Sequence, residues 1–132
     1  MLDDALSDYH FCVLNDCGIA IEYIHKQCGI KLNIPLQPNC TDDVALKLWQ
    51  IAEQFLEKAQ PEFIILQCGA DSLAGYPITQ LQLSSAFHGE VTKQLVVLAD
   101  KHSKGRLLPL GGGGYNLKNI KAAWNHVLEK LL

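Results

Sequence analysis

Two apolar segments of the sequence end abruptly in glycine-rich turns. The run from Phe63 to Cys68 is apolar except for Gln67 and breaks at Gly69. The run from Leu107 to Leu110 breaks at four consecutive glycines, Gly111 to Gly114. Continuous apolar runs of this length suit strands that are covered on both faces, as in a parallel sheet. The two segments therefore predict buried parallel strands, each closed by a tight turn.

Four further segments carry apolar residues at helical spacing behind a residue suited to cap a helix. The predicted caps are Asn15 or Asp16, Thr41, Ser84 and Asn116. A shorter apolar run from Leu32 to Leu36 contains Pro35 and is predicted to be an edge strand. Because strands and helices alternate, the fold is expected to be α/β, with right-handed crossovers and three layers in which helices cover both faces of a parallel sheet.

The composition excludes several classes of protein. With 132 residues, 48% of them hydrophobic and 19% charged, the chain is expected to form one domain with a modest core. The net charge is −3 and the 11 Lys and Arg residues are scattered, which argues against direct binding of nucleic acid. No apolar run is long enough to cross a membrane.

The start of the chain and its cysteines bear on its compartment. The acidic start Met1-Leu2-Asp3-Asp4 argues against a signal peptide. Five cysteines without a Cys-x-x-Cys unit are expected to be reduced and mostly buried. The chain is therefore predicted to be cytoplasmic.

Two side chains with chemical capability follow the predicted strands. Asp71 lies just beyond the first strand and Tyr115 just beyond the second, and sites in parallel sheets form at the carboxyl ends of strands. A rigidly held carboxylate suits a metal ligand, while the alternative for Asp71 is an aspartate that caps the loop. For Tyr115, a hydroxyl aimed at a substrate oxygen competes with a partly buried structural tyrosine. The residues alone leave both pairs of alternatives open.

The four glycines also permit a phosphate cradle between a strand and a helix N-terminus. The dinucleotide fingerprint fails, because its third glycine would fall on Asn116. No Lys-Ser or Lys-Thr pair follows, as it does in a nucleotide-binding loop. A phosphate site is therefore the minor alternative for this turn.

Two segments carry a resemblance to a known family. They are Ile65-Leu66-Gln67-Cys68-Gly69-Ala70-Asp71-Ser72-Leu73-Ala74-Gly75 and Leu110-Gly111-Gly112-Gly113-Gly114-Tyr115-Asn116. Together they resemble the late part of the catalytic domain of the zinc-dependent histone deacetylases, a family that includes the bacterial acetoin-utilisation proteins. The resemblance implies a partial arginase/deacetylase-like fold and, as the family activity, zinc-dependent hydrolysis of an acetyl-amide on lysine or on a related small amine.

The resemblance also implies roles for single residues. Asp71 matches the aspartate that supplies the last zinc ligand, and Tyr115 matches the tyrosine that donates a hydrogen bond to the amide carbonyl. An earlier segment, Phe11-Cys12-Val13-Leu14-Asn15-Asp16, also resembles the family. The resemblance places Phe11, Ile78 and Gly113 in the wall of the acyl-lysine tunnel.

Several positions depart from the family pattern. His10 stands where a glycine is expected, and Tyr76 stands where an aspartate is usual. Asp3 and Asp4 stand where the resemblance places the tandem histidines. The five histidines form no His-x-x-x-His or Asp-x-His pair and are expected to be exposed on helices or loops; they are His10, His25, His88, His102 and His126.

The resemblance covers one partial domain in two pieces, residues 1–30 and residues 32–132. Between these pieces the family has a strand and an Asp-x-His motif that supplies the other two zinc ligands, and the sequence from Gly29 to Leu32 has no room for them. Because a catalytic zinc takes three protein ligands, this chain is expected to be inactive. The alternative is a non-catalytic pseudoenzyme remnant or an interaction module. An absent strand leaves sheet edges exposed, which favours marginal stability or self-association.

Overall fold

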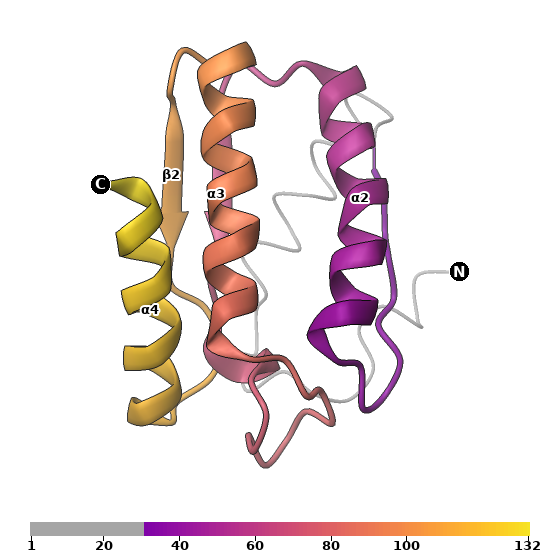
Figure 1. The fold of residues 1–132 in the computed structure, drawn as a ribbon, viewed down its shortest axis with the longest axis vertical. Coiled ribbons are helices and arrows are strands. Elements are labelled where there is room, and N and C mark those ends of the chain that lie inside the picture. Colours follow the sequence, from indigo (N-terminus) through magenta and orange to yellow (C-terminus); the bar gives the residue numbers. More distant parts are fainter. Residues whose placement is uncertain (1–30) are drawn as a thin grey trace. The chain divides into compact units, whose positions relative to one another are not determined.

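The computed structural model describes residues 31–132, and residues 34–132 form one compact unit. Within that unit the chain runs through α2 (Asp42–Ala59), β1 (Ile64–Gln67), the short 3-10 helix η2 (Ala70–Ser72), α3 (Ser85–His102), β2 (Leu107–Leu110) and α4 (Leu117–Leu131) (Figure 1). The helix predicted to begin at Asn15 or Asp16 lies outside the described residues.

The sheet of the described chain has two strands, and they are parallel. Ile64 lies opposite Leu107 and Gln67 lies opposite Leu110, so both strands end at the same edge. Helix α3 lies between them in the sequence, as a crossover between parallel strands requires. The α/β class and the parallel pairing predicted from the two apolar runs are therefore confirmed.

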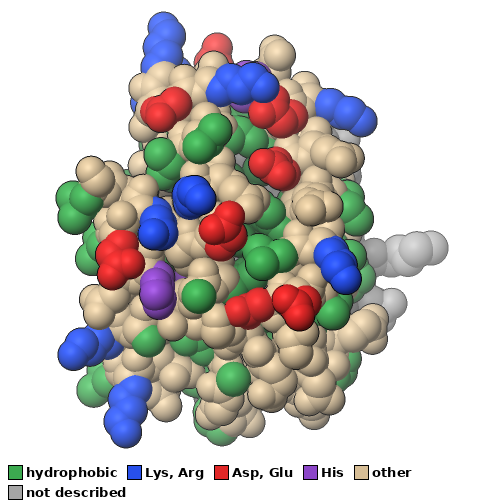
Figure 2. All heavy atoms as spheres, in the orientation of Figure 1, with side chains coloured by type: hydrophobic (Ala, Val, Ile, Leu, Met, Phe, Trp, Pro, Cys, Tyr) green, Lys and Arg blue, Asp and Glu red, His purple; other side chains and the backbone are tan. Residues whose placement is uncertain are grey.

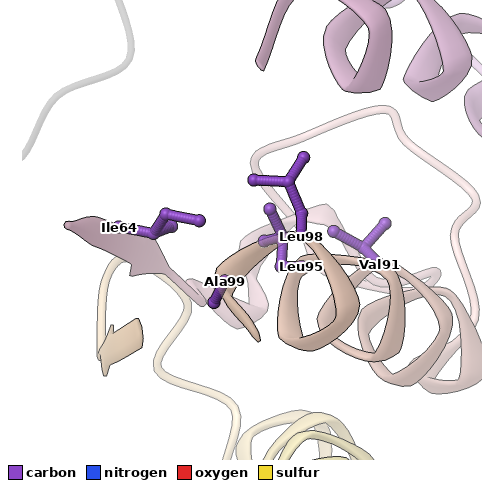
Figure 3. Packing of buried hydrophobic residues seen from close by; sticks show 5 residues of the cluster. All are labelled: Ile64, Val91, Leu95, Leu98 and Ala99. Atoms are coloured by element: carbon purple, nitrogen blue, oxygen red, sulfur yellow. The ribbon is translucent and has the colours of Figure 1, made fainter. Parts of the chain in front are cut away.

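One face of the sheet packs against α3 and forms the main core. Ile64 contributes from β1, and four buried side chains contribute from α3; they are Val91, Leu95, Leu98 and Ala99 (Figure 3). Trp49 and Leu56 of α2 pack against the same cluster. Full burial of a valine, leucine or isoleucine side chain stabilises a fold by about 1.5–3 kcal/mol. Because most of the cluster lies on α3, this helix contributes most of its buried apolar surface.

Helix α4 packs closely along α3 (Figure 1). A Cβ added to Gly89 of α3 would lie 3.1 Å from the Cβ of His126 on α4. Gly89 is buried within α3, although glycine weakens a helix interior. The absent side chain lets the two helices approach at this point.

The other face of the sheet is exposed in the described part of the molecule. Alternate residues along the strands point to this face, and Ile65 is 62%, Leu108 44% and Leu110 42% exposed. Residues 31–132 therefore contribute helices to one face only, whereas the sequence predicted helices on both faces. The apolar runs correctly indicated that both faces are hydrophobic, and the remaining predicted helix, from Asn15 or Asp16, lies outside the described residues.

One local prediction is wrong, and a second, the cap at Thr41, is right in position only. Leu32 to Leu36 has no strand conformation in the structure, because Pro35 lacks a backbone donor and the segment turns at Asn39, whose φ is 62°. Thr41 stands at the N-cap of α2, but its side chain makes no capping hydrogen bond. Ser84 and Asn116 do cap their helices: the Ser84 hydroxyl accepts from the Ala86 N–H, and the Asn116 side chain accepts from two amides at the start of α4.

The structure also bears on the expectations for the cysteines and for membrane-spanning helices. Cys40 and Cys68 are buried free thiols, as predicted for the cysteines; the other three lie outside the described residues. In the described part of the chain, no helix is both long and apolar enough to span a bilayer.

Candidate functional site

The Asp71 turn begins where β1 ends. Gly69 leads into η2, and the Ala70 N–H donates to the carbonyl oxygen of Gly113 at 2.8 Å. The Thr79 hydroxyl donates to the carbonyl oxygen of Asp71. The backbone on both sides of the Asp71 side chain is therefore held by segments that are distant in sequence.

The glycine turn after β2 lies directly against Asp71. A Cβ added to Gly113 would overlap the Asp71 carboxylate, and a Cβ added to Gly114 would overlap the backbone of Ala70 and Asp71. Gly114 has φ 93°, a conformation that other residues rarely adopt. These glycines are therefore required because the two turns touch.

The Gln67 side chain contacts both turns where they leave the strands. Gln67 ends β1, and its Oε1 accepts from the Gly69 N–H at 3.0 Å. A Cβ added to Gly112 would overlap the Gln67 amide. The polar residue that interrupts the first apolar run thus connects the ends of the two strands.

The Asp71 carboxylate has no hydrogen-bond partner among residues 31–132, which leaves its oxygens available to a ligand. No group of three or more His, Cys, Asp or Glu side chains that could hold a metal ion occurs within these residues. Catalytic zinc takes three protein ligands and keeps one position for water. The described residues therefore do not fit a catalytic zinc by themselves.

The other predicted site residues lie at or near the same edge. Tyr115 follows Gly114 directly and is 66% exposed, so it is not the partly buried structural tyrosine of the alternative interpretation. Gly113 lies against Asp71, and Ile78 is half-buried in the loop before α3, next to Thr79. Phe11 lies outside the described residues.

Two histidines that the sequence analysis expected to be exposed are partly buried and hydrogen-bonded. His88 Nε2 lies 3.1 Å from the Ser72 hydroxyl oxygen. His102 Nε2 lies 2.9 Å from Glu57, and the side chain of His102 is 11% exposed. Neither position carries a motif, because the partner comes from a distant segment. For His88, the one sequence feature that could have indicated a contact with the Asp71 turn is its position in the first turn of the helix that follows the Asp71 loop.

Burial governs the protonation of two groups near the turn. Desolvation lowers the pKa of the His88 imidazole, and the nearby carboxylates of Asp71 and Asp42 act in the opposite direction. Burial raises the pKa of the Cys68 thiol, so this thiol stays protonated and unreactive at neutral pH. Within residues 31–132, the turn thus combines a carboxylate without a hydrogen-bond partner, a neutral imidazole and an inert thiol.

Comparison with known proteins places this arrangement in a family. A family model described as a histone deacetylase domain matches residues 24–131. Histone deacetylase 7 of Arabidopsis thaliana is 38% identical over 124 residues, which make up 92% of this chain and 29% of that protein. A probable deacetylase of Archaeoglobus fulgidus is 33% identical over 104 residues, 78% of this chain and 28% of that protein.

Solved structures agree with the sequence comparison. The histone deacetylase Clr3 superposes with a TM-score of 0.69 at 29% identity, over 76% of this chain and 16% of that one. An acetylpolyamine aminohydrolase from Burkholderia pseudomallei shares the fold, with a TM-score of 0.65 at 16% identity, over 76% of this chain and 28% of that one. The chain spans less than a third of the length of these relatives. It has the partial arginase/deacetylase-like fold that the resemblance implied, and it belongs to the histone deacetylase family.

Proposed function

We propose that this chain is a histone deacetylase-like protein that contributes one zinc ligand, Asp71, and does not hydrolyse acetyl-amides by itself. The observation that supports this is the single free carboxylate at the edge of the sheet, since residues 31–132 offer no second and third ligand beside it. One oxygen ligand cannot hold zinc against water with useful affinity.

The family supports a proposal for the substrate class of the site. Relatives of this chain are named as histone deacetylases and an acetylpolyamine aminohydrolase, which supports acetylated lysine or a small acetylated amine as the ancestral substrate. Tyr115 is the side chain proposed to donate a hydrogen bond to the acetyl carbonyl, and its exposure leaves the hydroxyl accessible. Ile78 and Gly113, together with Phe11, are proposed to line the path of the acyl chain. The buried free thiols support a reducing compartment, the cytoplasm.

Zinc content and turnover of the purified chain test this proposal together. We expect zinc well below one ion per chain by mass spectrometry of the metal and no hydrolysis of a fluorogenic acetyl-lysine peptide. Asp71→Asn and the matched surface variant Asp100→Asn are then indistinguishable from the parent chain. Stoichiometric zinc, with turnover lost in Asp71→Asn and kept in Asp100→Asn, would overturn the proposal.

The exposed face of the sheet favours a second function, that of an interaction module. Ile65, Leu108 and Leu110 form an apolar surface on this face, and within residues 31–132 neither strand has a neighbour on its outer edge. Exposed sheet edges and contiguous apolar surface promote association. A second copy of the chain is the proposed occupant, since it brings an identical apolar face.

Analytical ultracentrifugation over a range of concentrations tests the interaction module. We expect reversible self-association that Ile65→Lys weakens. Val97→Lys is the matched control, because Val97 is 64% exposed on α3, away from the sheet face. A parent chain that remains monomeric at all concentrations, or equal effects of the two lysines, would contradict the proposal.

A further inference from the structure

The hydrogen bond between Ser72 and His88 joins the Asp71 turn to α3. Ser72 follows Asp71 directly and is the last residue of η2. Its hydroxyl oxygen lies 3.1 Å from His88 Nε2, and its carbonyl oxygen accepts from the Leu83 N–H at 3.4 Å. Both the side chain and the backbone of Ser72 are thus connected to the segment that leads into α3.

The imidazole is held by a rigid part of the fold. His88 lies in the first turn of α3, whose N-cap residue Ser84 is itself anchored by α2, because the Ser84 N–H donates to Asp42 at 2.8 Å. The Thr92 hydroxyl donates to the carbonyl oxygen of His88 at 2.7 Å. The Phe87 and His88 rings meet edge to face, with centroids 6.2 Å apart. A side chain supported on a helix in this way positions its partner more accurately than a loop residue does.

The chemistry of the pair allows the Ser72 hydroxyl to donate to His88 Nε2 when the ring proton is on Nδ1. Burial lowers the pKa of His88, so the imidazole is neutral at pH 7 and has one donor nitrogen and one acceptor nitrogen. A serine hydroxyl donates readily to the acceptor nitrogen. Without that partner, a serine beside a tight turn bonds to nearby backbone groups instead and favours other turn geometries.

We infer that His88 is a positioning residue for Asp71: by accepting the Ser72 hydroxyl on Nε2, it holds η2 in the conformation in which no group of residues 31–132 hydrogen-bonds to the Asp71 carboxylate. The inference rests on the proposed function, in which Asp71 is the ligand that this chain contributes. His88 acts beside the two other contacts that hold the turn, from Thr79 to the Asp71 carbonyl and from Ala70 to Gly113.

Nitrogen NMR of the full, metal-free chain tests the hydrogen bond itself. At neutral pH the His88 ring is expected to carry its proton on Nδ1, with Nε2 shifted as an acceptor. Ser72→Ala is expected to move the ring towards the Nε2–H tautomer, a change that a purely structural role of His88 does not produce. An unchanged tautomer in Ser72→Ala would overturn the inference.

Amide hydrogen exchange tests the effect on the turn. The Ala70 N–H, which bonds to Gly113, is expected to exchange about tenfold faster in His88→Ala, because the loss of one hydrogen bond lowers the free energy of local opening. His88→Gln retains a group able to bond Ser72 and is expected to stay within about threefold of the parent chain. His126→Ala is the control, since His126 lies on α4 with a side chain 40% exposed. If His88→Ala does not fold, Ser72→Ala removes the same bond with a smaller change and is expected to give the same acceleration.

The double variant His88→Ala/Ser72→Ala tests whether the two residues act through one interaction. Exchange at Ala70 in His88→Ala/Ser72→Ala is expected to be no faster than in either single variant, since both remove one interaction. Additive effects, or equal acceleration in His88→Gln and His88→Ala, would overturn the inference. Because these measurements use metal-free chain, turnover of acetyl-lysine would overturn the proposed function and leave this coupling intact. Independent effects of Ser72 and His88 would overturn the coupling and leave the zinc content unchanged.

Discussion

At the scale of single residues, the Asp71 turn lies directly against the glycine turn, and this contact yields a matched pair of variants. Gly114 has φ 93° and its added Cβ would overlap backbone atoms of Ala70 and Asp71. Gly114→Ala is expected to lower the free energy of unfolding by about 2 kcal/mol or more, since strain and overlap act together. Gly111→Ala, whose Cβ meets nothing within 4 Å, is expected to change it little. Urea denaturation measures both; equal effects would show that the two turns do not touch.

A second prediction at the residue scale concerns pH. Hydrogen bonds from Lys101, and then from His102, lower the pKa of Glu57 from its ordinary value of 4.5. A carboxyl group whose pKa is depressed on folding contributes stability above its unfolded pKa and loses it as the pH falls through its folded pKa. Glu57→Gln is therefore expected to flatten the fall in thermal stability below about pH 4.5.

Melting temperatures at several pH values check this effect. Glu53→Gln is the control, because Glu53 lies on the same helix without an ion-pair partner among the described residues. The control is expected to keep the acid-induced loss of the parent chain. Parallel curves for Glu57→Gln and the parent would contradict the contribution of Glu57.

At the scale of elements, the helix caps show which hydrogen bonds could be predicted from the sequence and which could not. Ser84 and Asn116 were identified from residue type and position, and their side chains make the expected bonds, since those bonds are local. Thr41 has the same signature and makes no such bond. His88 was expected to be exposed, because its partner Ser72 is 16 positions away and no local pattern encodes that contact. Two of the three caps in the described residues were thus predictable from the local sequence, and the tertiary hydrogen bond of His88 was not.

The two kinds of cap give an element-scale prediction. The Asn116 side chain accepts from the N–H groups of Lys118 and Asn119 at 3.0 and 3.3 Å. Asn116→Ala is expected to cost about 1 kcal/mol of stability, the usual value of a lost N-cap. Thr41→Ala removes no capping bond and is expected to cost less. Circular dichroism with urea measures both, and a larger loss in Thr41→Ala would contradict the assignment of the caps.

At the scale of the whole unit, residues 34–132 depend on one central helix. Both α2 and α4 pack against α3, and α3 also covers the sheet (Figure 1). On the face drawn in Figure 2, acidic and basic side chains are interspersed without a block of one sign. The Lys101–Glu57 ion pair joins α3 to α2, and the apolar cluster on α3 packs against α2 and the sheet. The sequence revealed the apolar faces of all three helices, but the central role of α3 arises from packing alone.

Because α2, α4 and the sheet all pack against α3, we expect them to unfold together. The chain has two tryptophans, Trp49 on α2 and Trp124 on α4, so Trp124→Phe and Trp49→Phe each leave one fluorescent reporter at opposite sides of α3. In each variant, the fluorescence transition in urea is expected to coincide with the loss of helix by circular dichroism, as in two-state unfolding.

Leu95→Ala, added to each reporter variant, tests whether a change in the core on α3 destabilises α2 and α4 equally. Leu95 is 3% exposed within the cluster on α3, and its truncation is expected to cost about 2–5 kcal/mol. Because native domains are stable by only about 5–15 kcal/mol, the midpoints of both reporters should fall together. Leu128→Ala, at a position 48% exposed on α4, is expected to shift neither midpoint by a comparable amount. A shift of one reporter without the other would show that α2 and α4 unfold independently, and the packing around α3 would then not explain the stability of the unit.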